Sequence, residues 1–313
     1  MASNSESLQA MLHIRSLILA IVGASLFGVS GTLSSILFRV DGMPFSTLVS
    51  LRMLVAGVLA LAIMRPSFPR ISLFNFLVFS IVGIFGVQIT YLATISYSDA
   101  PTATLLQYLF FPMVMIYELA RKRIKLSVAI IISLILALGG TFELTTSFPA
   151  HSATILLNPL ALLFGLLSAL TAALYTIMSG PIVRQSKTLP AITWSFVIGG
   201  LFSIIFSFNT SYLYFSRITM AELPGILILV ILVAVFGTLV AFGLYIKSMQ
   251  EITATQASLA GTMEPITAAL SSSILLGVVL TGFQYLGGAM IIAAILVVQV
   301  LSFRNWSPRK ADD

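Results

Sequence analysis

Ten apolar stretches, each close to twenty residues long, constrain how this 313-residue chain can fold. An α-helix needs about 20 apolar residues to cross the hydrocarbon core of a bilayer. The sequence therefore predicts an all-α integral membrane protein with ten transmembrane helices. Their predicted ranges are 16–38, 45–64, 73–97, 101–120, 126–144, 158–180, 190–208, 224–249, 254–276 and 281–303.

The composition supports a membrane protein. Hydrophobic residues make up 58% of the chain and charged residues only 8%, with a mean hydropathy of +1.08. A soluble domain carries roughly a quarter charged residues, so the apolar excess must face lipid. The polar segment 1–15 runs into the first apolar stretch without a small-residue cleavage site, which predicts a retained first span rather than a signal peptide. The chain has no cysteine, which excludes disulfides and thiol chemistry.

The basic residues predict the orientation. With a cytoplasmic N-terminus, 13 of the 16 Lys and Arg residues fall in cytoplasmic segments, as the positive-inside rule requires. Arg39 and Arg217 lie outside, and Arg52 lies within a span. Both termini are then cytoplasmic, and the net charge of +6 needs no nucleic-acid partner. The thirteen are Arg15, Arg65, Arg70, Arg121, Lys122, Arg123, Lys125, Arg184, Lys187, Lys247, Arg304, Arg309 and Lys310.

The two halves of the chain resemble each other. A shift of 143 residues lays Ser25, Thr32 and Gly57 over Ser168, Tyr175 and Gly200. A shift of 153 lays Thr102 over Thr255 and Pro112 over Pro265, and the segment 209–223 accounts for the change of offset. Five helices per half is an odd number, so the second half enters the membrane from the opposite side. We predict two inverted five-helix repeats, 14–144 and 158–303, an organisation typical of secondary transporters.

Two stretches carry a family resemblance. "GLYIKSMQEITATQASLAGTMEPITAALSSSILLG" (243–277), followed by "TGFQYLGGAMIIAAILVV" (281–298), resembles the last two helices of EamA-type members of the drug/metabolite transporter superfamily. "YLATISYSDAPTATLLQYLFFPMVMIYELARKRI" (91–124) is similar to the equivalent part of the first half.

The resemblance implies ten helices in two inverted repeats that move small metabolites, often outward. It also implies a central cavity lined by the helices at 16–38, 73–97, 101–120, 158–180, 224–249 and 254–276. One departure is that the family's frequent Gly-Glu pair after the ninth helix is Gly277-Val278 here, whereas the first half keeps Glu118.

Enzyme chemistry has little support in the sequence. All five lysines lack a preceding glycine, so the phosphate-binding G-K-[S/T] loop is absent from the chain. The two histidines, His13 and His151, are predicted at opposite membrane faces, which leaves no zinc cluster and no Ser-His-Asp arrangement. We therefore predict no catalytic residue, no metal site and no cofactor.

Hydroxyl-bearing residues form a stripe on the predicted helix 158–180. Ser168, Thr171, Tyr175 and Ser179 fall at i, i+3, i+7 and i+11, on one helical face. Such a stripe either lines a cavity or lets helices pack closely. We favour the cavity here, because Tyr175 is too bulky for close packing. The first helix has a similar stripe, and there we favour packing; it comprises Ser25, Gly28, Thr32 and Ser35.

Polar side chains also recur in the third and fourth predicted helices. Gln88 and Tyr91 are three residues apart, and Gln107 and Tyr108 precede Pro112. A buried amide must face protein, water or a ligand, so these glutamines line a pocket or bond between helices. Tyr91 and Tyr108 suit an aromatic pocket for an amphipathic solute. For Arg52, we expect the side chain to extend to the outer headgroups.

Glu264 and Pro265 interrupt the small, apolar stretch "ASLAGTMEPITAAL" at 257–270. A charge at mid-membrane costs about 2.5 kcal/mol or more, so Glu264 should face the bundle interior or a water-filled cavity. Desolvation favours its protonated form and makes it a candidate proton carrier; the alternatives are an ionised partner of a cationic ligand or Arg52, and a fixed interhelical hydrogen bond. Pro265 frees the carbonyl of Gly261 to accept from a solute or water. We predict Pro112 and Pro265 as hinges.

These observations favour a secondary active transporter of the plasma membrane, in a prokaryote the inner membrane, that works by alternating access. We predict an exporter of a small metabolite such as an amino acid or a related amphipathic compound, with proton coupling through Glu264. The alternative is a non-transporting membrane sensor or assembly partner. The expected partners are the solute and the lipid bilayer. The predicted substrate residues are Gln88, Tyr91, Gln107, Tyr108, Ser168, Thr171, Tyr175 and Glu264.

Overall fold

The computed structural model describes residues 2–98, 100–124, 126–146, 158–277, 279 and 281–304. Every regular element in these ranges is a helix, as predicted. In chain order they are α1 (Ala2–Arg39), α2 (Phe45–Met64), α3 (Leu73–Leu77), η1 (Val78–Phe85), α4 (Gly86–Tyr97), α5 (Ala100–Gln107), α6 (Phe110–Ala120), α7 (Val128–Thr146), α8 (Pro159–Ser186), α9 (Thr188–Phe215), α10 (Leu223–Ala234), η2 (Val235–Val240), α11 (Ala241–Ser248), α12 (Ala254–Gly261), α13 (Met263–Leu276) and α14 (Gly282–Arg304).

The membrane character of the fold is confirmed. Within the described residues, seven segments are long and apolar enough to cross a membrane: 11–39, 45–64, 73–97, 103–120, 159–186, 188–215 and 223–248. Two shorter apolar helices, Val128–Glu143 and Gly282–Val297, lie in α7 and α14. The remaining predicted span is divided at Thr262 into α12 and α13. The chain is thus a multi-pass membrane protein, and the count of ten spans stays a prediction.

The two halves share the same helix irregularities. The third predicted span contains a π-helical segment, η1, and its repeat counterpart contains another, η2. The fourth span breaks at 108–109, between α5 and α6, and the ninth breaks at Thr262. The shift of 153 residues lays 109 over 262. Pro112 and Pro265 each stand in the first turn after their break, where a proline needs no backbone donor.

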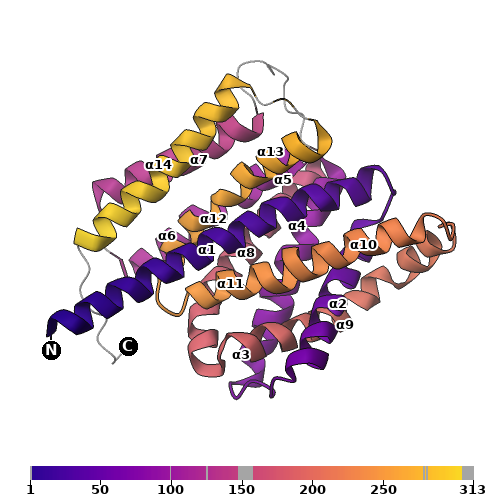
Figure 1. The fold of residues 1–313 in the computed structure, drawn as a ribbon, viewed down its shortest axis with the longest axis horizontal. Helices are drawn as coiled ribbons and strands as arrows, with labels where there is room; N and C mark the ends of the chain where they lie inside the picture. The colour runs from indigo at the N-terminus through magenta and orange to yellow at the C-terminus, as the bar shows by residue number, and fades with distance from the viewer. Residues whose placement is uncertain are drawn as a thin grey trace.

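Helices from different halves pack in pairs around the centre. α2 contacts α9, α4 contacts α8, and α1 contacts both α11 and α13. α7 and α14 lie against each other along one side of the bundle, at the upper left of Figure 1. α1 begins and α14 ends at the same end of the molecule (Figure 1), which agrees with termini on one side of the membrane. The interface between the halves therefore runs through the middle of the bundle.

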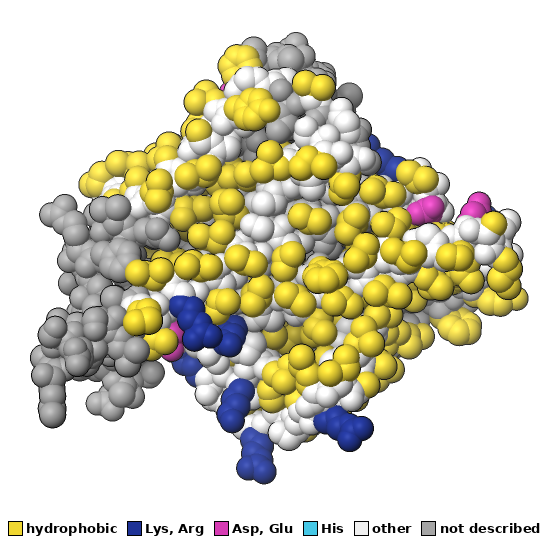
Figure 2. Space-filling model, viewed as in Figure 1, with side chains coloured by type: hydrophobic (Ala, Val, Ile, Leu, Met, Phe, Trp, Pro, Cys, Tyr) yellow, Lys and Arg dark blue, Asp and Glu magenta, His cyan; other side chains and the backbone are white. Residues whose placement is uncertain are grey.

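The surface matches a lipid-embedded bundle. Figure 2 shows apolar side chains across most of the visible face, with most of the visible Lys and Arg side chains gathered at its lower edge. On α9, the lipid-accessible residues include Leu201, Ile205 and Phe208, each more than half exposed. Apolar groups cover these surfaces because lipid, unlike water, does not penalise their exposure.

Two members of the α1 stripe, Gly28 and Thr32, serve close packing, as we expected. A side chain at Gly28 would overlap the backbone of Glu264 and the side chain of Thr267 on α13. One turn later, the Thr32 hydroxyl lies 2.7 Å from the Ser271 hydroxyl. Small residues thus allow α1 and α13 to approach, which fixes the depth of Glu264 in the bundle.

Glu118 joins the halves at the predicted cytoplasmic end. Its side chain is 2% exposed, and its Oε2 accepts from the Thr255 backbone N–H (3.1 Å) and hydroxyl (2.6 Å). Thr255 lies in the first turn of α12, where the helix dipole and free N–H groups favour a carboxylate. Glu118 of the first half therefore caps a helix of the second.

Candidate functional site

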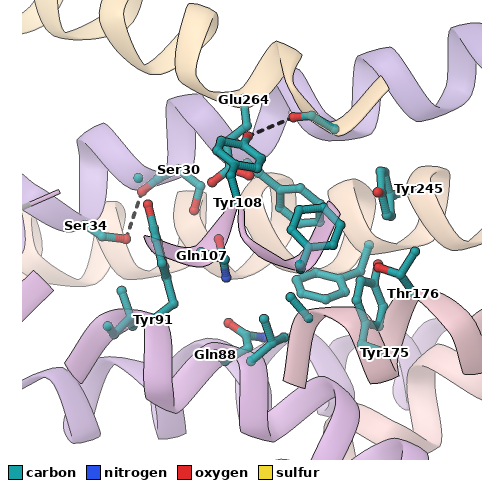
Figure 3. Close-up of a pocket in the computed structure, with 18 of the residues that line it drawn as sticks. Ser30, Ser34, Gln88, Tyr91, Gln107, Tyr108, Tyr175, Thr176, Tyr245 and Glu264 are labelled. Atoms are coloured by element: carbon teal, nitrogen blue, oxygen red, sulfur yellow. Dashed lines mark hydrogen bonds between the residues drawn. The ribbon is translucent and has the colours of Figure 1, made fainter. Parts of the chain in front are cut away.

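A cavity of about 100 Å³ lies between the two halves in the middle of the bundle. Its lining comes from the spans that the family resemblance implied, with one addition from α2. Figure 3 shows the polar and aromatic side chains converging on it. The cavity brings together six of the eight predicted substrate residues: Gln88, Tyr91, Gln107, Tyr108, Tyr175 and Glu264.

Glu264 enters the cavity at the start of α13, directly after the break at Thr262. Its side chain is partly buried, and its backbone carbonyl accepts from the Thr267 hydroxyl at 3.0 Å. Among the described residues, the carboxylate itself has no hydrogen-bond partner. The predicted alternative of a fixed interhelical bond is therefore not formed, and the acidic group is free to meet a solute, water or proton.

The Gly261 carbonyl is not free for a solute, contrary to our expectation. It accepts a hydrogen bond of 3.0 Å from the hydroxyl of Tyr108, which lies at the break between α5 and α6. The break in one half therefore satisfies the backbone group released by the break in the other. Nearby, the Tyr245 hydroxyl donates to the Ala257 carbonyl at 2.9 Å. Two tyrosines thus fix α12 beneath the cavity, because unpaired carbonyls are costly in an apolar medium.

Three buried polar side chains at the cavity have no partner among the described residues. The Gln88 amide lacks a partner at both Nε2 and Oε1, although the side chain is only 4% exposed. The Tyr175 and Ser30 hydroxyls are in the same condition. Native proteins pair most buried polar groups, so each exception requires an explanation. A polar ligand or water in the cavity would supply the missing partners.

One other glutamine and one other tyrosine of the lining already form hydrogen bonds within the protein. The Gln107 Nε2 donates to the Ser168 hydroxyl at 3.0 Å, and the Tyr91 hydroxyl lies 2.9 Å from that of Thr104. These residues line the cavity with their polar groups held in fixed positions. Gln107 therefore matches the interhelical alternative as well as the cavity prediction.

Ser168 and Thr171 lie outside the lining. Ser168 receives the hydrogen bond from Gln107, whereas Thr171 bonds to the carbonyl of Leu167 in its own helix at 2.8 Å. The methyl group of Thr171 faces Gly86 on α4. For these two residues the structure favours packing, and only Tyr175 of the predicted substrate residues on α8 reaches the cavity.

Aromatic rings form one wall of the cavity. Phe27 and Phe242 meet edge to face with centroids 4.7 Å apart, and Tyr175 stacks on Tyr245 at 6.1 Å. Phe242 and Tyr245 did not stand out in the sequence, although their i, i+3 spacing puts both on one face of α11. Such a wall suits the apolar part of an amphipathic solute.

Sequence reasoning also missed the cavity face of α1. Phe27, Ser30, Gly31 and Ser34 line the cavity, with the i, i+3, i+4, i+7 spacing of a helical face. The predicted stripe lies beside this face and contacts α13. The first helix therefore has two neighbouring faces that carry small and hydroxyl-bearing residues. Only the helical spacing of these residues could have distinguished the cavity face from the packing face in the sequence.

Arg52 is buried at the cavity and does not extend to the headgroups, which corrects our expectation. Its side chain is 8% exposed and lines the cavity from α2. Its Nε donates to the Thr238 hydroxyl on η2 at 3.0 Å. The lining thus contains a cation as well as the carboxylate of Glu264.

A second cavity, of about 360 Å³, lies at the predicted outer ends of α1 and α4. Ser35, Arg39 and Ser98 are among its lining residues.

On the same predicted side, the Thr219 backbone N–H and hydroxyl donate to Glu222 at 2.9 and 2.8 Å and lower the pKa of that carboxyl. Burial, with a smaller contribution from Glu222, raises the pKa of Asp41.

Comparisons with known proteins agree with this architecture. The model of the EamA-like transporter family matches the chain twice, over residues 14–146 and 159–300. The chain is 30% identical over 297 residues to a protein described as the uncharacterized inner membrane transporter YicL of Salmonella typhimurium, covering 91% of this chain and 95% of that protein. A solved crystal structure superimposes with a TM-score of 0.77 over 93% of this chain and 99% of its own, at 16% identity, which shows the shared fold alone.

Proposed function

This chain belongs to the EamA-like transporter family, and from that premise we propose that it is a secondary active transporter that exports a small metabolite by alternating access. The proposed substrate is an amino acid or a related amphipathic compound. The observation that carries the proposal is the unpaired carboxylate of Glu264 in a cavity between the two halves. The chain is a membrane transporter by family; its substrate, direction and mechanism are our proposal.

The cavity supports an amphipathic solute because it combines an aromatic wall with polar groups that lack partners. The Gln88 amide and the Tyr175 hydroxyl can bind polar atoms of a solute, while Phe27 and Phe242 contact its apolar part. The lining has a single cation, Arg52, which argues against a multiply charged phosphate substrate.

Glu264 is the proposed coupling residue. Removal from water favours the neutral carboxyl, so proton binding and release can accompany exposure of the cavity to each side of the membrane. The titratable groups that line the cavity with it are Arg52 and the hydroxyls of Tyr91, Tyr108, Tyr175 and Tyr245. None of these tyrosines ionises near neutral pH in water, which leaves Glu264 as the proton carrier.

The breaks in the two halves provide the proposed hinges. Pro112 and Pro265 follow them, and the Tyr108–Gly261 hydrogen bond joins one break to the other. In this proposal the repeats 14–144 and 158–303 move against each other about that contact. The match to an inner membrane transporter favours the plasma membrane, the inner membrane in a bacterium.

Flux measurements in proteoliposomes test this function. The purified protein should exchange a radiolabelled amino acid or related amphipathic compound, with a rate that depends on pH. Glu264→Gln keeps the shape of the side chain and removes its ionisation, so we expect normal expression and melting with transport lost or its pH dependence abolished.

Glu251→Gln is the matched control, because Glu251 is exposed at the predicted cytoplasmic end. Its flux and pH profile should equal those of the wild type. A wild-type pH profile in Glu264→Gln would exclude Glu264 as the coupling group. Solute binding without flux in the wild-type protein would favour the sensor or assembly partner.

A further inference from the structure

The environment of Arg52 assigns the cavity a second charged group. A buried arginine in a transmembrane helix is costly and needs a partner or a water-filled space. Only one side of the guanidinium is engaged by protein, through the 3.0 Å bond from Nε to Thr238. Among the described residues, its two terminal amino groups have no hydrogen-bond partner. These two groups form the planar fork that binds a carboxylate through two parallel hydrogen bonds.

The π-helical segment η2 orients this arginine. The Thr238 hydroxyl donates its proton to the Val233 carbonyl at 3.0 Å, five residues earlier, in the manner of a π-helical turn. The hydroxyl oxygen therefore accepts from Arg52 rather than donating. Thr238 is 0% exposed, so water does not compete for this bond. Thr238 thus positions the guanidinium with its fork directed away from η2.

The internal repeat shows that this helix contact does not need an arginine. The shift of 143 residues lays Arg52 over Ser195 on α9, which contacts η1 as Arg52 contacts η2. There, the hydroxyls of Ser195 and Ser80 lie 2.8 Å apart, and both residues are fully buried. Two hydroxyls suffice to join the repeat-related pair of elements, α9 and η1. The guanidinium consequently has a purpose beyond holding α2 against η2.

When Glu264 has released its proton, Arg52 and Glu264 give the cavity two opposite charges. Both line it and attract each other electrostatically, but the structure forms no direct ion pair between them. Two charges taken out of water without a partner are each unfavourable by several kcal/mol. A solute with one carboxylate and one ammonium group would neutralise both at once. A purely cationic or anionic solute would leave one charge unpaired.

We propose that Arg52, held by Thr238, is the carboxylate receptor of the cavity, and that the cavity selects zwitterions by binding their ammonium group at Glu264. This inference rests on the proposed function and narrows its substrate class. The aromatic wall at Phe27, Phe242 and Tyr245 then faces the remaining, apolar part of the solute.

The test compares three probes that share one side chain. L-leucine is the zwitterion, L-leucinamide lacks the carboxylate, and 4-methylpentanoate lacks the ammonium group. The same set is measured for phenylalanine with phenylalaninamide and 3-phenylpropanoate. Binding to purified protein is followed by ligand-induced thermal shift and by calorimetry. For the wild type, the zwitterion of at least one set should bind tenfold or more tightly than either analogue.

Arg52→Gln should reduce zwitterion affinity about tenfold or more and leave the affinity for the amide unchanged. Thr238→Val should lower the ratio of zwitterion to amide affinity by a smaller factor, because the fork loses its orientation. Ser195→Val removes the repeat-related contact of α9 with η1 and should leave that ratio unchanged, even if the melting temperature falls. Arg52→Ser, which copies Ser195, provides a second variant if Arg52→Gln fails to fold.

The possible results distinguish failure of the zwitterion inference from failure of the proposed transport function. Equal weakening of zwitterion and amide by Arg52→Gln would show a merely structural arginine and overturn the inference. A wild-type protein that binds and moves other solutes, but none of these zwitterions, would overturn the inference and keep the proposed transport function. A wild-type protein that moves no solute in any liposome assay would overturn the proposed function itself.

Discussion

Gln88 shows how one side chain can favour ligand binding at the expense of protein stability. Its amide is buried at the cavity with neither end paired, and an unsatisfied buried group costs about 1–3 kcal/mol. A fold that gained nothing from this amide would be more stable with an apolar side chain of similar shape. We therefore interpret Gln88 as a ligand-binding residue.

Gln88→Met should leave the melting temperature of the empty protein unchanged or raise it, and should weaken solute binding. The free energy gained on removing the unpaired amide is about 1 kcal/mol or more. Thermal melting with and without solute measures both effects.

Gln107→Met is the matched control for this prediction. The Gln107 amide donates to Ser168, so its loss breaks a hydrogen bond and should lower the melting temperature. A comparable loss of stability in Gln88→Met would mean that the Gln88 amide has a stabilising partner, and would contradict our interpretation.

At the residue scale, the sequence indicates which polar side chains face the bundle interior, but it does not settle where each of them points. Glu264, Gln88 and Tyr175 were predicted at the cavity because polar groups in an apolar helix must face the interior. Arg52 was misplaced because its long side chain could reach either the headgroups or the cavity, and only the packing of α2 against η2 decides between them. Ser168 and Tyr175 share a stripe, yet of these two only Tyr175 lines the cavity, beside Ala172 and Thr176 of the same helix.

At the scale of elements, the breaks in the fourth and ninth spans are the features that shape the site. Pro265 indicated the second break in the sequence, and the Gly261 carbonyl was predicted to be released there. Its partner, Tyr108, comes from the other half and could not be inferred from local pattern. The π-helical segments were not predicted either, because an extra residue in a helical turn depends on tertiary contacts such as that between Thr238 and Arg52.

The contact of α1 with α13 gives an element-scale prediction. Gly28→Ala places a methyl group against the backbone of Glu264, so the two helices must separate. Overpacking of this kind typically costs about 1–3 kcal/mol. We expect a lower melting temperature together with reduced flux, since Glu264 would shift with α13.

Gly31→Ala provides the control on the same helix. A side chain there meets no atom within 4 Å, and alanine favours a helix over glycine by about 0.5–1 kcal/mol. Its melting temperature should equal or exceed that of the wild type. Equal melting temperatures of the two variants would show that the packing of α1 against α13 does not require a glycine at position 28.

At the scale of the whole molecule, the two-repeat membrane fold was predictable because it depends on counts and periods rather than contacts. Apolar length, the distribution of Lys and Arg, and two constant shifts suffice for it. The pairing of α2 with α9 and of α4 with α8 was not predictable in the same way, since it depends on which helix faces fit together. The ten-span count, the repeat boundaries and the side on which the termini lie stay predictions.

The last prediction tests that orientation with single cysteines in a chain that has none. Ser98, after α4, and Gln185, near the end of α8, are both exposed and lie beyond most of the apolar length of their helices. With cytoplasmic termini, Ser98 is external, and Gln185, which lies three predicted spans further along the chain, is cytoplasmic. In intact cells a membrane-impermeant thiol reagent should label Ser98→Cys at once and Gln185→Cys only after the membrane is permeabilised.

Labelling of both from outside would contradict the inverted repeat, and labelling of Gln185→Cys alone would keep the repeat but reverse the protein in the membrane. The expected pattern would place the Glu118–Thr255 contact on the cytoplasmic side and the cavity at Arg39 on the external side, as the distribution of basic residues predicts.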